Sequence, residues 1–233
     1  MKSLEGMSIL ITGGGSGIGF GTARHLIERG ARVTICGRRA DKINAAAATL
    51  GSACHGVAAD ITVASDRQKL IAATLEHGGK IDALLNNAGN MYRGAITDLE
   101  EDSLQDIFNT NVIAAMLLTG LATPHLALRE GAVIFVGSIH TRRAFPGASP
   151  YAATKAAVQG LTRVLAAELG EQKIRVNCLL PGAVFTEINQ RAGLMDDETA
   201  LQRLEGMSDL HALGRIGTAE EVAEAMAFLI CAE

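Results

Sequence analysis

The sequence has few of the features that mark metal-binding, disulfide-rich, nucleic-acid-binding or membrane proteins. Its four cysteines lie far apart and form no CxxC pair, so neither a disulfide framework nor a zinc site is expected. Its six histidines show no HExxH spacing, and we predict no metal ion. A formal net charge of −4 gives no electrostatic reason to bind nucleic acid or an anionic membrane. The apolar runs are only as long as strands, and the first residues lack the shape of a signal peptide. A reduced, cytoplasmic protein fits these absences best.

What the sequence contains is a regular alternation of short apolar runs and amphipathic stretches. With 233 residues, 48% of them hydrophobic, the chain can bury one substantial core. Most runs are apolar on both faces, as strands of a helix-covered parallel sheet must be; they lie at 8–12, 32–36, 53–58, 83–86, 132–136 and 174–180. Helices are expected at 17–29, 41–50, 65–76, 99–121 and 151–170. A last helix runs to residue 232 and opens at Thr218 and Glu221, which have the spacing of a capping box. The alternation predicts an α/β fold, a single domain over residues 1–233 with a doubly wound parallel sheet.

A glycine-rich turn follows the first predicted strand, at residues 12–19 (TGGGSGIG). Glycine allows a tight turn and a close approach to a pyrophosphate, while the following helix N-terminus offers free N–H groups. The glycines at 13, 17 and 19 form G-x-x-x-G-x-G, and no lysine-bearing P-loop is present. The alternative is an ordinary strand-to-helix turn.

The end of the second predicted strand bears on the choice of nucleotide. An acidic residue there would hold the ribose 2′-hydroxyl of NAD, whereas an arginine accommodates the 2′-phosphate of NADP. The sequence has Arg38 and Arg39 and no carboxylate at this point. Guanidinium groups suit phosphate, so NADP(H) is preferred and NAD(H) remains possible. The alternative is that both arginines form a solvated basic turn.

Tyr151 and Lys155 lie four residues apart near the start of a predicted helix, so they face the same side. An ammonium group stabilises a phenolate and would lower the pKa of the tyrosine, which makes it a usable acid or base. Ser138 follows a predicted strand, at the edge where open α/β sheets bind ligands. The strand ends at Asn87 and at Pro181 carry small or polar residues at that same edge.

These residues stand in the order of a known set of motifs. The sequence resembles the short-chain dehydrogenase/reductase family over roughly its whole length, and within it the branch of the 3-oxoacyl-carrier-protein reductases. The resemblance rests on Thr12-Gly13-x-x-x-Gly17-Ile18-Gly19, Asp60, Asn86-Asn87-Ala88-Gly89, Asn111, Ser138, Tyr151-x-x-x-Lys155 and Pro181-Gly182.

The resemblance implies four catalytic residues. Tyr151 would exchange a proton with the substrate oxygen, and Ser138 would hydrogen-bond that oxygen as charge develops on it. Lys155 would bind the nicotinamide ribose and depress the pKa of Tyr151, and Asn111 would hold a water of a proton relay. The alternative for Asn111 is an ordinary polar residue of a long helix.

The resemblance also implies a cofactor site. Asp60 would contact the adenine, Asn87 the adenosine ribose and Thr186 the nicotinamide carboxamide, although Asp60 and Thr186 could equally cap helices. The full expected set is Gly13, Ser16, Gly17, Ile18, Gly19, Arg38, Arg39, Asp60, Ile61, Asn87, Ala88, Gly89, Tyr151, Lys155, Pro181, Gly182, Val184 and Thr186.

The expected activity is NAD(P)-dependent hydride transfer between a secondary alcohol and a carbonyl in a small-molecule substrate. One alternative is 3-oxoacyl-carrier-protein reduction specifically; another, of a different class, is a non-catalytic nucleotide-binding scaffold. The residues about 184–210 are expected to form a lid over the substrate. His140, Arg142 and Arg143 would suit an acidic substrate or simply face solvent.

The sequence ends where members of this family continue into one more strand. Either the sequence is cut short at this point or the sheet lacks its last edge strand. A homo-oligomer is expected in spite of this. A dimer through the helices at 99–121 and 151–170 does not need that strand, whereas a tetramer through it is in doubt.

Overall fold

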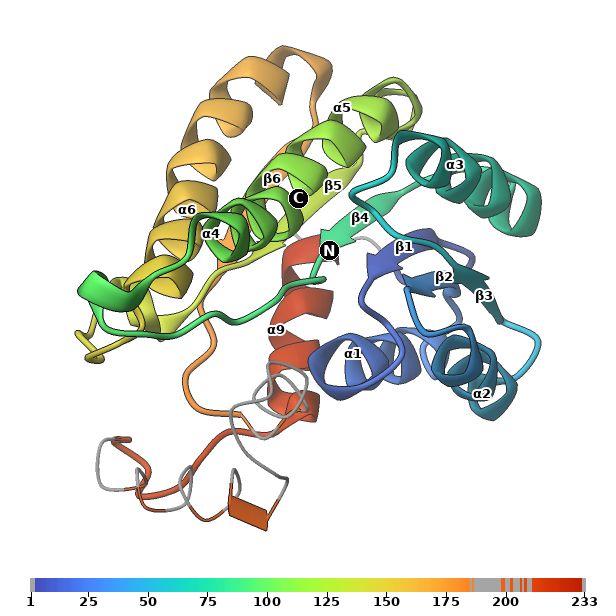
Figure 1. Cartoon of the computed structure of the whole chain (residues 1–233). Coiled ribbons are helices and arrows are strands. Elements are labelled where there is room, and N and C mark those ends of the chain that lie inside the picture. The colour runs from blue at the N-terminus through green and yellow to red at the C-terminus, as the bar shows by residue number, and fades with distance from the viewer. Residues whose placement is uncertain are drawn as a thin grey trace.

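The computed structural model describes residues 3–184, 186, 198–199, 202, 206, 208 and 211–231. Six strands of this part of the chain form one parallel sheet in the order β3-β2-β1-β4-β5-β6 (Figure 1). They are β1 (Ser8–Thr12), β2 (Arg32–Gly37), β3 (Cys54–Ala58), β4 (Ala83–Asn86), β5 (Ala132–Val136) and β6 (Arg175–Leu179). The strand order runs outward in both directions from β1 and β4, as in a doubly wound sheet. The predicted α/β class with a doubly wound parallel sheet is confirmed.

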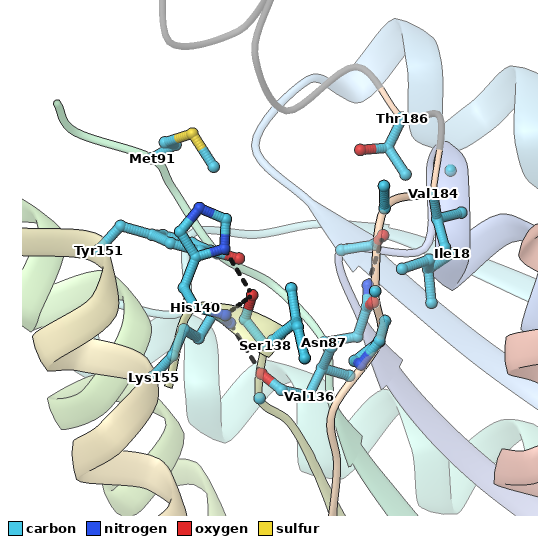
Figure 2. A pocket seen from close by; sticks show the side chains of 18 of the residues that line it. Ile18, Asn87, Met91, Val136, Ser138, His140, Tyr151, Lys155, Val184 and Thr186 are labelled. Atoms are coloured by element: carbon cyan, nitrogen blue, oxygen red, sulfur yellow. Dashed lines mark hydrogen bonds between the residues drawn. The ribbon is translucent and has the colours of Figure 1, made fainter. Parts of the chain in front are cut away.

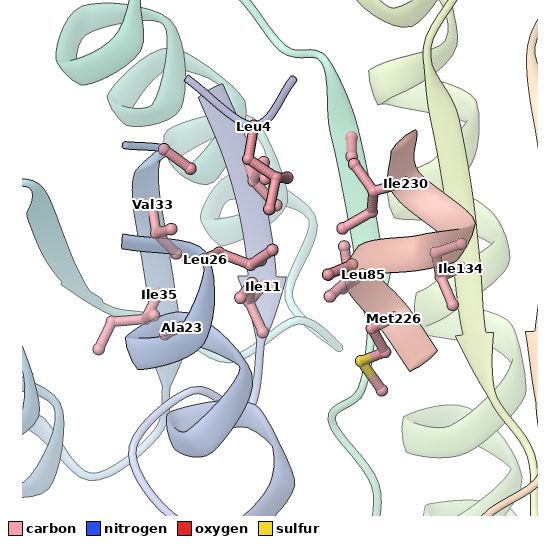
Figure 3. Packing of buried hydrophobic residues seen from close by; sticks show 14 of the residues in the cluster. Leu4, Ile11, Ala23, Leu26, Val33, Ile35, Leu85, Ile134, Met226 and Ile230 are labelled. Atoms are coloured by element: carbon pink, nitrogen blue, oxygen red, sulfur yellow. The ribbon is translucent and has the colours of Figure 1, made fainter. Parts of the chain in front are cut away.

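Helices cover both faces of this sheet (Figure 1). On one face lie α1 (Gly17–Ile27), α2 (Ala40–Leu50) and α9 (Ala219–Cys231), and on the other α3 (Ala64–Gly78), α5 (Ala114–Ala127) and α6 (Ser149–Leu169). Successive strand residues point to opposite faces. Ile9 and Ile11 therefore join the core beneath α1 and α9, whereas Leu10 between them joins the core beneath α5 and α6. Figure 3 shows part of the first core, with Leu26 of α1 and Met226 of α9 facing the sheet.

The predicted helix at 99–121 differs from the observed structure. The chain forms α4 (Glu101–Phe108), a π-helical turn η2 (Asn109–Ile113) and then α5. A π turn inserts an extra residue into a helix and often marks a functional site. Thr110 and Asn111 within it are buried. Sequence periodicity missed the turn, in which Asn111 contacts Asn90 and Thr154, residues distant in the sequence. The other predicted elements match the observed ones apart from small shifts at their ends.

The continuous helical segment at 101–127 is long and apolar enough to cross a membrane, judged by length and composition. However, 50% of its most apolar window is buried inside the molecule. Leu118, Ala122 and Leu126 are fully buried in the core against the sheet. This segment is therefore explained as a core helix.

The capping box predicted at the start of α9 is present. The Thr218 backbone N–H donates to Glu221 Oε2 at 2.9 Å, and the Glu221 N–H donates to Thr218 Oγ1 at 3.2 Å. Arg215 also donates two hydrogen bonds to the Glu221 carboxylate, which lowers the pKa of Glu221 to about 2. These contacts hold the first turn of the helix that covers β5 and α1.

We predict that Thr218→Ala lowers the free energy of unfolding by about 1 kcal/mol, because one N–H at the start of α9 loses its partner. Thr49→Ala is the matched control. The Thr49 hydroxyl is also exposed, but it donates to Ala45 O within α2 and caps nothing. Urea denaturation should show little change for Thr49→Ala. Equal losses in the two variants would mean that the capping box contributes nothing specific.

Candidate active site

The carboxyl ends of the parallel strands surround a cavity (Figure 2). The glycine turn after β1 and the first turn of α1 form one wall, and the residues that follow β4, β5 and β6 form the others together with α6. Its lining residues are Gly13, Ser16, Gly17, Ile18, Asn87, Ala88, Gly89, Met91, Arg93, Val136, Gly137, Ser138, Ile139, His140, Phe145, Tyr151, Lys155, Pro181, Gly182, Ala183, Val184 and Thr186. The cavity thus brings together most of the residues predicted from the sequence.

The glycine turn is tight for a physical reason. Gly13 and Gly17 have φ angles of +69° and +55°, which other residues rarely adopt. A Cβ on Gly19 would clash with the carbonyl oxygen of Gly13. The turn therefore needs glycine at all three predicted positions, and it opens into the free N–H groups of the α1 N-terminus.

Asn87 holds this turn in place. Its Nδ2 donates to Thr12 O at 2.9 Å and to Gly13 O at 3.1 Å. In return the Thr12 hydroxyl accepts the backbone N–H groups of Asn87 and Ala88. These bonds join the ends of β1 and β4. Asn87 lines the cavity as predicted, and the structure adds a tie between strands that the sequence did not reveal.

A second, smaller cavity adjoins the first at the ends of β2 and β3. Arg38, Asp60 and Ile61 line it, together with Ala88 and Gly89. The Asp60 carboxylate accepts bonds from the Thr62 N–H at 2.9 Å and the Thr62 hydroxyl at 2.7 Å, so it also caps the turn before α3. The alternative of a helix N-cap is wrong, because Val63 is the N-cap residue of α3. A contact between Asp60 and adenine stays a prediction.

The two arginines predicted to read a 2′-phosphate are placed differently. Arg38 lines the smaller cavity, where one of its guanidinium nitrogens lies 3.5 Å from Asn90 Oδ1. Arg39 precedes α2 as its exposed N-cap residue and lines neither of the two cavities. The geometry therefore favours Arg38 of the pair.

Tyr151 and Lys155 lie on the first turns of α6 and are both buried. Lys155 Nζ donates to Val136 O at 2.8 Å and lies 5.5 Å from the centroid of the Tyr151 ring. Burial lowers the pKa of Lys155 to about 8 and raises the pKa of Tyr151, while a hydrogen bond with Ser138 pulls the tyrosine pKa down. The sequence predicted a depressed tyrosine pKa, and that direction was wrong for this environment. Desolvation outweighs the hydrogen bond with Ser138.

Asn111 joins two parts of the site. Its Oδ1 accepts the Asn90 N–H at 2.7 Å, and its Nδ2 donates to Asn90 O and to Thr154 Oγ1, both at 3.0 Å. The π turn thus clamps the loop after β4 to α6. Thr154 directly precedes Lys155, so this contact lies beside the buried lysine. A relay water at Asn111 stays a prediction.

The segment after β6 forms another part of the cavity wall. Pro181, Gly182 and Val184 line it, and Val184 pairs with Gly217 in an isolated parallel bridge. Thr186 lies over the glycine turn, since a Cβ on Gly17 would come within 3.1 Å of the Thr186 side chain. Most of the predicted lid at 184–210 lies outside the described residues.

Sequence reasoning missed Arg93, and it left His140 open as a contact for an acidic substrate or a solvent-facing residue. His140 lines the cavity, with its ring centroid 5.1 Å from that of Tyr151 and 4.4 Å from that of Phe145. Arg93 lines it from the loop after β4. Burial, with a smaller contribution from the charge of Arg93, lowers the pKa of His140 to about 4. For Arg93 no sequence signal was available, whereas His140 could be singled out by its place between Ser138 and Tyr151. Arg142 and Arg143, grouped with it from the sequence, are exposed and do not line the cavity.

The arrangement combines a phosphate-type glycine turn with a proton-carrying tyrosine, a serine hydroxyl and a buried lysine. No cluster of three or more potential metal ligands occurs in the described part of the chain. A Rossmann-type sheet with these groups at its carboxyl edge defines an oxidoreductase of the nucleotide-dependent class.

Comparisons with known proteins agree with this class. The family model described as short chain dehydrogenase matches residues 7–197. The chain is 35% identical to dehydrogenase/reductase SDR family member 4 of Bos taurus, over 99% of this chain and 82% of that protein. It therefore belongs to the short-chain dehydrogenase/reductase family.

Solved structures show the same similarity. A short-chain dehydrogenase/reductase of Caenorhabditis elegans, solved with cofactor, superposes with a TM-score of 0.92 at 31% identity, covering 97% of this chain and 89% of that one. The 3-ketoacyl-(acyl-carrier-protein) reductase of Brucella melitensis, complexed with NADH, gives a TM-score of 0.89 at 33% identity, covering 99% and 92%.

Proposed function

We propose that this protein is an NADP(H)-preferring oxidoreductase that interconverts a secondary alcohol and a carbonyl in a small-molecule substrate. One observation carries the proposal. Ser138, Tyr151 and Lys155 line the same cavity, and the glycine turn forms its opposite wall. Two structural relatives that were solved with a cofactor support a nicotinamide nucleotide in this cavity. The free cysteines, three of them buried, fit a reducing compartment such as the cytoplasm.

The residues fit a bound dinucleotide. The turn at Gly13 and Gly17, together with the α1 N-terminus, would hold the pyrophosphate, and the smaller cavity beside Asp60 would take the adenosine end. Lys155 would bind the nicotinamide ribose and Thr186 the carboxamide. The nicotinamide would supply or accept the hydride.

The protein's own residues would handle the proton. Because burial raises the pKa of Tyr151, its phenol is protonated at neutral pH and suited to give a proton to a carbonyl oxygen during reduction. The Ser138 hydroxyl would donate a hydrogen bond to that same oxygen. In the direction of oxidation the tyrosine must first lose its proton, so we expect the rate of that reaction to rise toward alkaline pH.

Tyr151→Phe tests the assignment. Without the phenolic proton, turnover should fall by about a hundredfold or more while nucleotide binding persists. Tyr92→Phe is the matched control, because Tyr92 is the other tyrosine of the chain and its hydroxyl accepts the Glu100 N–H near α4. Turnover should be measured with a panel of ketones and alcohols, and cofactor affinity by fluorescence titration. If Tyr151→Phe matched the native rate, the catalytic assignment would be wrong. If the native protein bound nucleotide but turned over no substrate, the scaffold alternative would be favoured.

The nucleotide preference is testable at Arg38. We predict that Arg38→Ala weakens NADPH binding by about tenfold or more, since a charge-assisted bond to the 2′-phosphate is lost, and changes NADH binding little. Arg39→Ala should have the smaller effect on NADPH, because Arg39 lies outside both cavities. Equal losses of NADPH and NADH affinity in Arg38→Ala would mean that this residue does not read the phosphate.

A more specific alternative is 3-oxoacyl-carrier-protein reduction. The likeness to the Brucella melitensis enzyme favours it. An acetoacetyl thioester offered beside simple ketones would separate this activity from general carbonyl reduction, because only the specific enzyme should prefer the thioester strongly.

We further propose a homodimer formed through the outer faces of α5 and α6. Apolar side chains lie half-exposed there, namely Ile113, Met116, Leu117, Leu121 and Val164. An exposed apolar patch of this kind marks an interface, and a second copy presents the same patch across a two-fold axis.

We expect Leu117→Glu to convert the dimer to a monomer in light-scattering measurements, because a carboxylate would be buried without a partner. Val63→Glu, at an exposed apolar residue beside α3, is the control and should leave the dimer intact. A native protein that is monomeric at micromolar concentration would contradict this assembly.

A further inference from the structure

The hydroxyl of Ser138 has three polar neighbours in this site. The His140 backbone N–H donates to Ser138 Oγ at 3.2 Å, and His140 Nδ1 lies 3.0 Å from the same oxygen. The Tyr151 phenol is also within hydrogen-bonding reach of it. Figure 2 shows the imidazole of His140 directed at Ser138. Short-range geometry imposes this arrangement, because Ser138 precedes the 3₁₀ turn η3 (Ile139–Thr141) and caps it.

The number of protons restricts how these bonds are arranged. A serine hydroxyl carries one proton to donate and two lone pairs that accept. The His140 N–H occupies one lone pair. If Ser138 gave its proton to His140 Nδ1, none would remain for Tyr151 or for a substrate oxygen. If Nδ1 carries the proton instead, it fills the second lone pair, and the serine proton is left to point toward Tyr151.

We propose that His140 is a positioning residue, present as the Nδ1–H tautomer, which donates to Ser138 Oγ and thereby directs the serine proton at the reacting oxygen. This inference rests on the proposed roles of Ser138 and Tyr151. Hydrogen bonds in a chain polarise one another, so a serine that accepts two of them is a stronger donor toward developing charge. With both lone pairs of Ser138 Oγ occupied by the backbone N–H and the imidazole, the serine proton would be donated only toward the reacting oxygen.

The surroundings of His140 keep its ring neutral and fixed. The charged and titratable groups near it are Arg93, whose charge opposes protonation, and Tyr151, which packs edge-on at an interplanar angle of 86°. Phe145 covers another side of the ring. Burial is the larger cause of the lowered pKa of His140, about 4. The imidazole is therefore uncharged at neutral pH and has a single proton, whose location decides the direction of the Ser138 bond.

The tautomer can be observed directly. We would label the protein with ¹³C,¹⁵N-histidine, record the ring nitrogen shifts at pH 7, and assign His140 by its absence in His140→Asn. A protonated Nδ1 and an unprotonated Nε2 are expected. A protonated Nε2 with a bare Nδ1 would overturn the proposal whether or not the enzyme turns over any substrate.

Kinetics of two matched variants supply a second test. Asparagine can place an amide N–H where Nδ1–H stands, whereas leucine fills similar space and donates nothing. We expect His140→Asn to keep kcat within about threefold of the native value. In His140→Leu, kcat should fall by about tenfold or more, which is less than the loss expected when an oxyanion donor itself is removed. The affinity for nucleotide should not change in either variant.

The pH profile separates positioning from packing. The hydrogen bond from Ser138 lowers the pKa of Tyr151, and in this proposal His140 directs that bond. His140→Leu should therefore weaken the bond and move the pH dependence of oxidation that is set by Tyr151 to higher pH, whereas His140→Asn should restore it. If His140 served only to pack against Tyr151 and Phe145, leucine would match or exceed asparagine and this pH dependence would not move. That result would overturn the inference. Failure of the proposed function would be recognised differently, by full activity in Tyr151→Phe.

Discussion

The parallel alignment of β1, β4, β5 and β6 is the constraint on which the site depends. Parallel strands end at the same edge of a sheet, so the residues after each strand meet there although they are far apart in sequence. The glycine turn, Asn87, Ser138 and Pro181 follow four different strands and line one cavity. The two apolar cores keep this edge rigid, because helices bury the strands on both faces. The polar groups can then be placed at the edge without loss of the sheet's own hydrogen bonds.

Burial determines the chemistry of that edge as much as the identity of its residues. Withdrawal from water disfavours the charged form of each group, and it moves the pKa of Tyr151 up while moving those of Lys155 and His140 down. The three side chains are thus driven toward their neutral forms by one cause. Lys155 offsets part of the cost by donating to the Val136 carbonyl, and Tyr151 offsets part through Ser138. A site of this kind responds strongly to any charge that enters it.

Several polar residues that look like ligand contacts in the sequence also hold the protein together. Asn87 ties the end of β1 to that of β4, Asn111 ties the loop after β4 to α6, and Asp60 caps a turn. The hydrogen bonds of these residues stabilise the fold, and they also set the shape of the cavity. Substitution at these positions is expected to disturb the geometry of the site as well as any direct contact.

The sequence by itself determined the strands and helices, the glycine turn and the Tyr151–Lys155 pair, because these follow from short-range rules. Apolar periodicity, the φ angles that only glycine accepts, and the spacing of residues on one helix face are all local properties. Tertiary structure alone decided the π turn at Asn111, the placement of Arg38 rather than Arg39 in a cavity, and the entry of His140 and Arg93 into the site. It also reversed the expected direction of the Tyr151 pKa. These features depend on desolvation and on neighbours brought together from distant parts of the chain, and no local pattern encodes either of them.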